Sequence, residues 1–316
     1  METSTIIFAD PHYYEVTYTP DVVYAHRETG DLTMQILTPC APNLPRKREP
    51  SPYTEFAVKT THPMFMPEAR RFPLIIGVAG SGWSGPDSHK MVPFVTFLAQ
   101  QGYVVACPSH RGTYRDEVRF PAAIQDIKEA IRFMRAHADE YCVDTERVGI
   151  IGGSSGGHTV TMVALSEGEE SFDIGENLDQ SSAVKACVTF YGPVDFPNLL
   201  DDRRAADKRK RPGEDKFPFE MYEMFKHDFE DDPEKYIDLV NVMRFIEKGK
   251  KYPDLMYFVG DRDEIIPVAQ GQRLCQKLRD CGSRADFVKI IGAGHGMHCW
   301  NGQSMEMIKN FFDATV

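Results

Sequence analysis

Short apolar runs alternate with helical segments along most of this chain, and the alternation limits the fold more than any other feature. The apolar runs, each bounded by turn residues, cover residues 73–79, 103–107, 147–151, 184–190, 255–259 and 285–290. Segments whose apolar residues recur at helical spacing cover residues 92–101, 121–141, 268–280 and 305–312. Because strands buried on both faces read as continuous apolar runs, the pattern predicts an α/β fold. We expect a mostly parallel, twisted sheet with helices on both faces.

The first 70 residues follow a different pattern. Residues 22–25 and 32–37 read as two strands around a glycine turn, and a stretch rich in proline and charge follows them. We therefore expect residues 1–70 to form N-terminal strands and an irregular extension that packs on the core. Residues 71–316 are expected to form the main domain.

A long charged and aromatic segment, residues 195–251, lies between two core strands of that domain. Its large apolar side chains include Phe217, Phe219, Met221, Tyr222, Met224, Phe225 and Phe229. Amphipathic spacing alone indicates a surface excursion packed on the core, whereas a long insertion at this place is typical of a cap over a binding site. We predict a cap, with the surface excursion as the alternative. The basic run Arg203–Arg211 lies among acidic residues and is interpreted as a solvated loop.

Charge and cysteine usage exclude several kinds of protein. The formal net charge of −11 argues against nucleic acid and anionic membrane surfaces as partners. No apolar run approaches the roughly 20 residues that span a bilayer, and no secretory signal is visible. The seven cysteines include no CxxC pair, so neither a disulfide framework nor a zinc site is indicated. We expect a cytoplasmic, reducing compartment and no metal or cofactor; the oligomeric state stays open, a homodimer included.

A glycine-rich turn follows the strand at residues 147–151. It reads Gly152-Gly-Ser-Ser-Gly-Gly157 and precedes a helical segment. A serine nucleophile on a sharp strand-to-helix turn needs this context, because small neighbours relieve the crowding and the helix start offers free N–H groups. A phosphate loop is the alternative, but neither GxGxxG nor a GK[ST] ending is present. The doubled serine permits two frames, with either Ser154 or Ser155 as the nucleophile.

A serine nucleophile needs a base, and the base needs an acid to orient it. In sheets of this kind the chain order is serine, acid, histidine. Asp263 follows the strand at residues 255–259, with Asp261 and Glu264 as nearby rivals. His295 follows the last strand within a glycine-rich loop, with His298 as its rival. Two other histidines, His110 and His158, could also lie near the site.

Acyl transfer also needs hydrogen-bond donors for the negative oxygen that develops in the transition state. One donor should be the backbone N–H after the nucleophile, which is Ser155 when Ser154 is the nucleophile. The second should come from the loop that follows the strand at residues 73–79. That loop reads Ala79-Gly80-Ser81-Gly82-Trp83, and we expect Ser81 or Gly82 to supply the donor.

Five segments together resemble the esterase/lipase group of α/β-hydrolases, which includes bacterial acetyl and feruloyl esterases and hormone-sensitive-lipase-like enzymes. Residues 152–158 are similar to its GGSAGGH motif, residues 191–195 to its YGPxD turn and residues 260–267 to its GxxDxxVP segment. Residues 120–135 look like its helix before the nucleophile, and residues 294–296 carry its histidine. The resemblance covers roughly residues 72–313 and implies the α/β-hydrolase fold.

The resemblance also implies roles for single residues. It makes Ser154 the nucleophile, Asp263 the acid and His295 the base. One departure concerns the family's HGGGW loop, which here reads Ala79-Gly-Ser-Gly-Trp83 and lacks the histidine and one glycine. The backbone donors survive this change, while the detailed geometry of the oxyanion hole is left open.

The expected function is that of a serine carboxylesterase that hydrolyses small carboxylic esters through an acyl-enzyme. Acetyl or feruloyl esters of carbohydrates follow from the family resemblance alone, since a fold does not fix a substrate. A serine peptidase or amidase with the same triad is the nearest alternative. A noncatalytic binding protein on a hydrolase fold is the alternative from another class, and such proteins typically lose a triad member.

Overall fold

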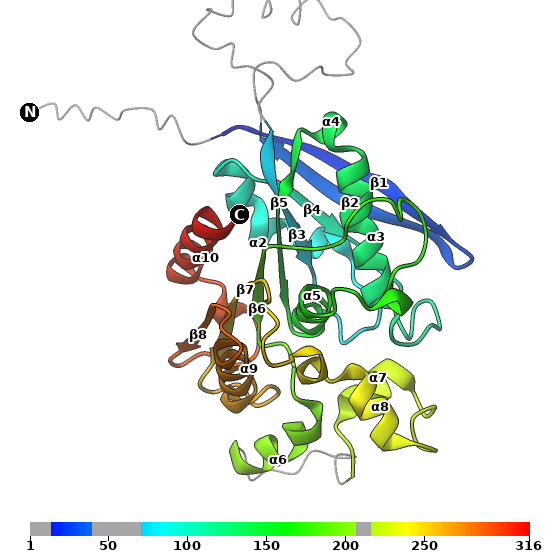
Figure 1. The fold of residues 1–316 in the computed structure, drawn as a ribbon, viewed down its shortest axis with the longest axis vertical. Helices are drawn as coiled ribbons and strands as arrows, with labels where there is room; N and C mark the ends of the chain where they lie inside the picture. The colour runs from blue at the N-terminus through cyan, green and yellow to red at the C-terminus, as the bar shows by residue number, and fades with distance from the viewer. Residues whose placement is uncertain (1–13, 40–70, 207–215) are drawn as a thin grey trace, which may run out of the picture.

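An eight-stranded sheet forms the centre of the computed structural model, which describes residues 14–39, 71–206 and 216–316. The spatial order is β1-β2-β4-β3-β5-β6-β7-β8 (Figure 1). The strands are β1 Val16–Arg27, β2 Gly30–Pro39, β3 Phe72–Val78, β4 Val104–Pro108, β5 Val143–Gly153, β6 Ala186–Phe190, β7 Asp254–Gly260 and β8 Ala285–Ile290. From β4 to β8 every neighbouring pair is parallel, so the predicted parallel sheet is confirmed.

The N-terminal strands extend this sheet in the opposite sense. β1 and β2 form an antiparallel hairpin around the predicted glycine turn, and β2 pairs antiparallel with β4. The hairpin therefore packs on the core through backbone hydrogen bonds. The proline-rich stretch expected to form an irregular extension lies within residues 40–70, outside the described part of the chain.

Helices cover both faces of the sheet, as the alternating pattern predicts. A side chain at Gly149 of β5 would meet Phe312 of the C-terminal helix α10, Gly302–Thr315. A side chain at Gly152, three residues along the same strand, would meet Val160 of α5, Ser155–Leu165. Because successive residues of a strand point to opposite faces, α10 and α5 lie on opposite faces. Figure 1 shows α10 on one side and α3 with α5 on the other.

The longer helices are α2 Val92–Gln100, α3 Ala122–Ala136, α5 Ser155–Leu165, α9 Val268–Asp280 and α10 Gly302–Thr315. Shorter turns are η2 Ser88–Lys90, α4 Ala138–Tyr141, η3 Glu170–Phe172, η4 Val242–Phe245 and η5 Met297–Cys299.

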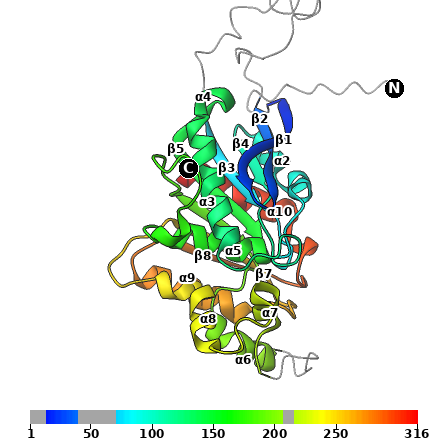
Figure 2. The same cartoon turned by 90° about the vertical axis from the view of Figure 1, so that its right-hand side faces the viewer.

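Three α-helices in the described part of residues 195–251 lie at one end of the molecule. They are α6 Phe196–Ala206, α7 Phe219–Phe225 and α8 Pro233–Val240, and both views show them together, far from α4 (Figures 1 and 2). Part of the segment's apolar surface is buried against the main domain. The ring of Phe225, for example, packs against Phe120 at 6.1 Å and against Tyr236 at 4.8 Å between ring centroids.

A buried ion pair holds two of these helices together. Arg203 of α6 pairs with Glu220 of α7, and the two side chains are only 5% and 2% exposed. The guanidinium also donates a 2.7 Å hydrogen bond from Nε to the carbonyl of Ile265, just beyond β7. The interpretation of the basic run as a solvated loop is therefore wrong for Arg203, because a carboxylate from a different helix offsets the cost of burying its charge. The rest of the run from residue 207 onward lies outside the described residues.

A second polar network ties α6 to α9. The buried amide of Gln270 accepts the backbone N–H groups of Val194 and Asp195 at 3.1 and 2.8 Å, and it donates to Asp202 at 2.7 Å. Arg273, one turn further along α9, pairs with both Asp195 and Asp202. The start of the 195–251 segment is thus fixed to the helix that follows Asp263.

We predict that Glu220→Gln lowers the free energy of unfolding by about 3 kcal/mol or more, because it removes a buried negative charge that pairs with the buried Arg203 guanidinium. Asp201→Asn is the matched control, since it removes an exposed carboxylate that pairs with Arg204 on the same helix α6. A surface pair of that kind contributes under about 1 kcal/mol. Urea unfolding followed by circular dichroism measures both, and equal small losses would contradict the prediction.

Candidate active site

The sharp turn after β5 places Ser154 beyond the carboxyl end of the strand and at the start of α5. Its backbone has φ 57° and ψ −126°, in the left-handed region that non-glycine residues rarely adopt. Two glycines make room for it. A Cβ at Gly152 would lie 2.6 Å from the carbonyl oxygen of Gly156, and a Cβ at Gly156 would lie 2.4 Å from the carbonyl oxygen of Val78. Larger residues at either glycine would force the turn apart.

Ser154, His295 and Asp263 form a continuous chain of hydrogen bonds. The Nε2 atom of His295 lies 2.9 Å from the Oγ of Ser154, and its Nδ1 atom lies 2.9 Å from the Oδ2 of Asp263. A carboxylate only accepts hydrogen bonds, so Nδ1 carries a proton and Nε2 faces the serine hydroxyl as an acceptor. This tautomer is the one that can remove a proton from Ser154.

The acid is fixed from its other side as well. The Oδ1 atom of Asp263 accepts the backbone N–H groups of Ile265 and Ile266, both at 2.8 Å, and its side chain is fully buried. The rival Asp261 instead accepts the backbone N–H of Gly292 at 2.6 Å, where it braces the loop that carries His295. The other rival, Glu264, is exposed.

Aromatic packing sets the position of the histidine ring. The ring of Tyr191 lies against that of His295, with 4.4 Å between centroids, and its hydroxyl accepts the indole N–H of Trp300 at 3.0 Å. Burial raises the pKa of Tyr191 to about 12. The rival His298 is exposed, and its carbonyl accepts the side chain of Asn301.

The loop after β3 lies directly against the turn at Ser154. A Cβ at Gly80 would lie 3.0 Å from the Cβ of Ser154. The Ser81 N–H donates to the Oγ of Ser155 at 2.8 Å, so the second serine of the pair meets this loop rather than His295. The Gly82 N–H has no hydrogen-bond acceptor within the described residues. The N–H of Ser155 lies at the first position of α5, where a helix has no preceding turn whose carbonyl could accept it.

A family model described as BD-FAE matches residues 64–278 of this chain. The match covers more than half of the sequence and runs from β3 into α9, with Ser154 and Asp263 inside it. The chain belongs to the BD-FAE family. The resemblance inferred from the motifs at residues 152–158 and 260–267 is thereby confirmed at the level of the family.

Two curated relatives of this BD-FAE chain carry the names of ester hydrolases. It is 26% identical over 208 residues to the probable carboxylic ester hydrolase LipM of Mycobacterium tuberculosis, covering 66% of this chain and 45% of LipM. It is also 26% identical over 232 residues to the esterase LipC of the same organism, covering 73% of this chain and 54% of LipC. The chain thus spans about half the length of the curated relatives it matches.

Solved structures share the fold over nearly the whole chain. A truncated carbohydrate esterase from gut microbiota superposes with a TM-score of 0.73 at 24% identity, covering 96% of this chain and 98% of that one. The apo form of Thermogutta terrifontis esterase 2 superposes with a TM-score of 0.64 at 21% identity, covering 96% and 93%. The fold of this BD-FAE member is therefore the α/β-hydrolase fold.

The structure assigns a position to His158, which the sequence alone left undecided. Its ring is fully buried, with Nε2 2.9 Å from the carbonyl of Val240 and Nδ1 accepting the indole N–H of Trp83 at 3.3 Å. Trp83 ends the loop at residues 79–83 and has a strained φ of 57°. One histidine therefore holds both that loop and the end of α8. Burial lowers the pKa of His158 to about 4, so it stays neutral at neutral pH.

The second undecided residue, His110, is buried without reaching the triad residues. Its Nδ1 atom donates to the carbonyl of Arg111 at 2.8 Å, and burial lowers its pKa. The motif at residues 152–158 already contained a signal for His158, since it ends in a histidine one turn into α5. Nothing comparable in the sequence marks Arg203 or Glu220.

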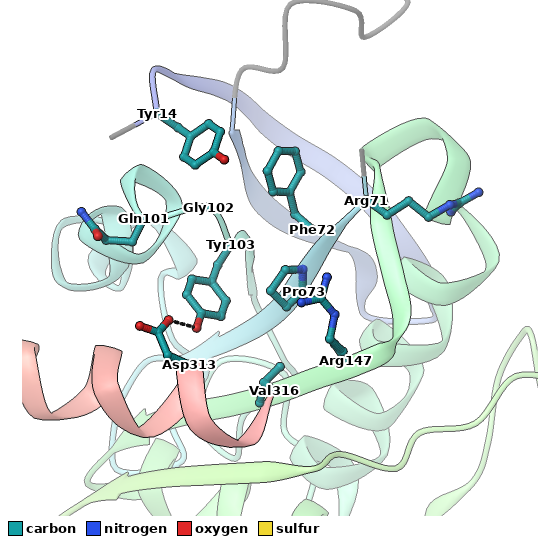
Figure 3. A pocket seen from close by; sticks show the side chains of 10 residues that line it. All are labelled: Tyr14, Arg71, Phe72, Pro73, Gln101, Gly102, Tyr103, Arg147, Asp313 and Val316. Atoms are coloured by element: carbon teal, nitrogen blue, oxygen red, sulfur yellow. Dashed lines mark hydrogen bonds between the residues drawn. The ribbon is translucent and has the colours of Figure 1, made fainter. Parts of the chain in front are cut away.

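A separate pocket lies at the other end of the sheet and plays no part in this site. It has a volume of about 280 Å³ and is lined by the amino-terminal ends of β3 and β4, including Phe72 and Tyr103 (Figure 3). Asp313 accepts the hydroxyl of Tyr103 at 2.6 Å there. Ser154 follows the carboxyl end of β5, so the sheet separates this pocket from it.

The described residues offer neither a cluster of metal ligands nor a membrane-spanning helix. No group of three or more histidine, cysteine, aspartate or glutamate side chains there could hold a metal ion. None of the described helices has the length and apolar character needed to cross a membrane.

We predict that His158 makes the stability of the fold depend on pH. In the unfolded chain the pKa of His158 is near 6.5, so the unfolded state binds a proton below that pH. The folded state binds this proton only below about pH 4. Stability therefore falls as the pH drops from 6.5 towards 4. Between pH 7 and pH 5 this residue should remove about 2 kcal/mol from the free energy of unfolding.

Urea unfolding at both pH values, for the wild type and for His158→Gln, measures that contribution. The variant has no group to titrate at this position and should lose correspondingly less stability between pH 7 and pH 5. His227→Gln removes an exposed histidine and serves as the control, with a pH dependence like that of the wild type. An unchanged pH dependence in His158→Gln would contradict the assignment.

Proposed function

We propose that the protein is a serine carboxylesterase that hydrolyses small carboxylic esters through an acyl-enzyme. One observation carries the proposal: the hydrogen-bonded chain from Ser154 through His295 to Asp263, located on the turns that follow β5, β8 and β7. The names of the curated relatives, a probable carboxylic ester hydrolase and an esterase, support the same reaction class.

The geometry supports the following steps. Nε2 of His295 takes the proton of Ser154 as Oγ attacks the ester carbonyl, and the proton then passes to the leaving alcohol. Asp263 keeps Nδ1 protonated and stabilises the imidazolium that forms. Water, activated by the same histidine, then attacks the acyl-enzyme and releases the acid. No cofactor is needed for either half of the reaction.

Backbone N–H groups near Ser154 are the proposed donors to the developing oxyanion. The N–H of Ser155, at the start of α5, is the first. The second is the N–H of Ser81 or that of Gly82. At rest the Ser81 N–H is bound to the Ser155 hydroxyl, so it becomes available only when that hydroxyl turns away, whereas the Gly82 N–H has no such competitor.

Residues 195–251, with helices α6, α7 and α8, are proposed as a cap over this site. Support comes from contacts with the loops around Ser154: the hydroxyl of Thr113 donates to the carbonyl of Met224 at 3.3 Å, and His158 contacts the end of α8. Acetyl or feruloyl esters of carbohydrates are the proposed substrates, in keeping with the carbohydrate esterase among the structural neighbours. A reducing, cytoplasmic location and a homodimer also stay proposals; the six described cysteines are free thiols.

A serine peptidase or amidase would use the same three residues. The two reactions differ in the leaving group, so one panel of substrates distinguishes them. An acyl-length series of p-nitrophenyl esters, with aryl amides of the same acids alongside, tests the reaction class. We expect hydrolysis of the short esters and none of the amides. The reverse preference would replace the proposal with the amidase alternative.

We predict that Ser154→Ala lowers the hydrolysis of p-nitrophenyl acetate by about 10⁴-fold or more, because a triad loses most of its effect when one member is removed. Ser155→Ala is the matched control from the same turn. It keeps its backbone N–H and frees that of Ser81, so its activity should stay within about tenfold of wild type. Labelling of the Ser154→Ala protein by a fluorophosphonate probe at the wild-type rate would refute the assignment.

We also predict that Asp263→Asn keeps the fold and lowers the rate by about 10⁴-fold, since the amide would favour the wrong tautomer of His295. Glu264→Gln and Asp261→Asn remove the neighbouring carboxylates and should have much smaller effects. Steady-state kinetics, together with circular dichroism to verify folding, measure all three. Losses of equal size at the three positions would leave Asp263 without a special role.

A further inference from the structure

Glu223 extends from α7 of the proposed cap towards the loop beside Ser154. A Cβ built on Gly82 would lie 3.3 Å from its Oε2 atom, and a Cβ built on Gly80 would lie 3.0 Å from the Cβ of Ser154. Gly82 offers one of the proposed oxyanion donors, so this carboxylate lies beside the loop that contacts the turn at Ser154. Neither strand pattern nor motif in the sequence had marked it.

This carboxylate has no partner among the described residues, in contrast to its neighbour Glu220, which pairs with Arg203. Glu223 is half-buried, and its burial, followed by the charge of Glu220, raises its pKa. A partly buried carboxylate without a hydrogen-bond donor is costly. Beside the loop that offers the proposed oxyanion donors, such a group is a candidate for substrate binding.

An exposed aromatic ring belongs to the segment that contacts α7. Thr113 donates its N–H to the carbonyl of Trp83 at 2.9 Å and its hydroxyl to the carbonyl of Met224, so the following residue, Tyr114, is held beside α7. Tyr114 is 50% exposed, although large aromatic residues are usually more deeply buried. Its pKa is raised by burial and then by the charge of Glu223, which fits their closeness.

We infer that Glu223 and Tyr114 form a subsite for the hydroxylated alcohol half of the ester, such as a sugar; this rests on the proposed esterase function. A carboxylate can accept two hydroxyl groups at once, and an aromatic face packs against the C–H face of a sugar ring. Because both groups are polar and partly exposed, they suit a hydroxylated alcohol better than an aliphatic acyl chain.

The local charges favour a neutral alcohol over a cationic one. The ammonium group of Lys226 already lies 5.7 Å from the centre of the Tyr114 ring. A cationic alcohol stacked on that ring would meet a like charge, which partly cancels the attraction of Glu223. A hydroxylated and uncharged group meets no such repulsion.

Two esters of the same acid test the subsite, because they share the acyl group and differ only in the alcohol. The probes are 6-O-acetylglucose and ethyl acetate, with acetate release as the readout. Glu223→Ala should lower kcat/KM for 6-O-acetylglucose by about tenfold or more, chiefly through KM, as expected for a lost hydrogen bond to a charged group. Ethyl acetate hydrolysis should stay within about twofold, because no hydroxyl is there to bind.

Matched variants separate binding from structure. Tyr114→Ala should weaken hydrolysis of the sugar ester alone, and Tyr114→Phe, which keeps the ring, should restore most of it. Glu234→Ala removes an exposed carboxylate from α8 of the same segment and should change neither substrate. Equal losses on both esters, or no loss on either, would refute the subsite.

The remaining outcomes are also decisive. If the wild type hydrolyses ethyl acetate but not 6-O-acetylglucose, the subsite is wrong while the esterase function stands. If Glu223→Ala impairs acetylcholine hydrolysis and leaves the sugar ester unchanged, the carboxylate binds cations and the inference fails. If the wild type hydrolyses no ester at all, the proposed function itself fails.

Discussion

The strained turn at Ser154 is the constraint on which the rest of this structure depends. A non-glycine residue with φ of 57° costs about 1–3 kcal/mol and persists only where its surroundings over-determine it. Here three strands do so. The N–H of Ser154 donates to the carbonyl of Phe190 at the end of β6, and Gly156 and Gly80 bring the backbones around β3 and β5 into close contact. Loss of any of these contacts would let the turn relax and move the Ser154 hydroxyl away from His295.

Buried polar side chains couple the proposed cap to that turn. His158 lies four residues after Ser154 and bonds both to Trp83 and to the end of α8. Arg203 bonds to Glu220 and to the loop that holds Asp263, and Gln270 fixes the start of the 195–251 segment. These groups are satisfied only when the cap and the loops around Ser154 are in their present positions. Displacement of the cap would leave several buried polar groups without partners, which is costly in a low-dielectric interior.

The core strands and most helices could be predicted from the sequence because their signals are local. Runs such as residues 73–79 and 147–151 are apolar on both faces, and the structure buries them between helices on either side. Differences are confined to boundaries: β5 begins at Val143, and the helix expected over residues 121–141 is divided into α3 and α4 at His137. The interpretation of Arg203 failed for a different reason. Its partner Glu220 is 17 residues away on another helix, and no local sequence pattern indicates such a pair.

The sequence by itself determined the order of strands and turns, the glycines that permit the turn at Ser154, and a short set of candidate residues on the loops that follow β5, β7 and β8. Local composition is sufficient for these, because backbone conformation and strand burial depend on near neighbours in the chain. Only the tertiary structure decided which candidates meet. It brings His295 to Ser154 rather than to Ser155, Asp263 rather than Asp261 to His295, and Glu223 to Gly82. Each of these contacts joins residues far apart in sequence, so it exists only once the sheet has aligned the ends of its strands.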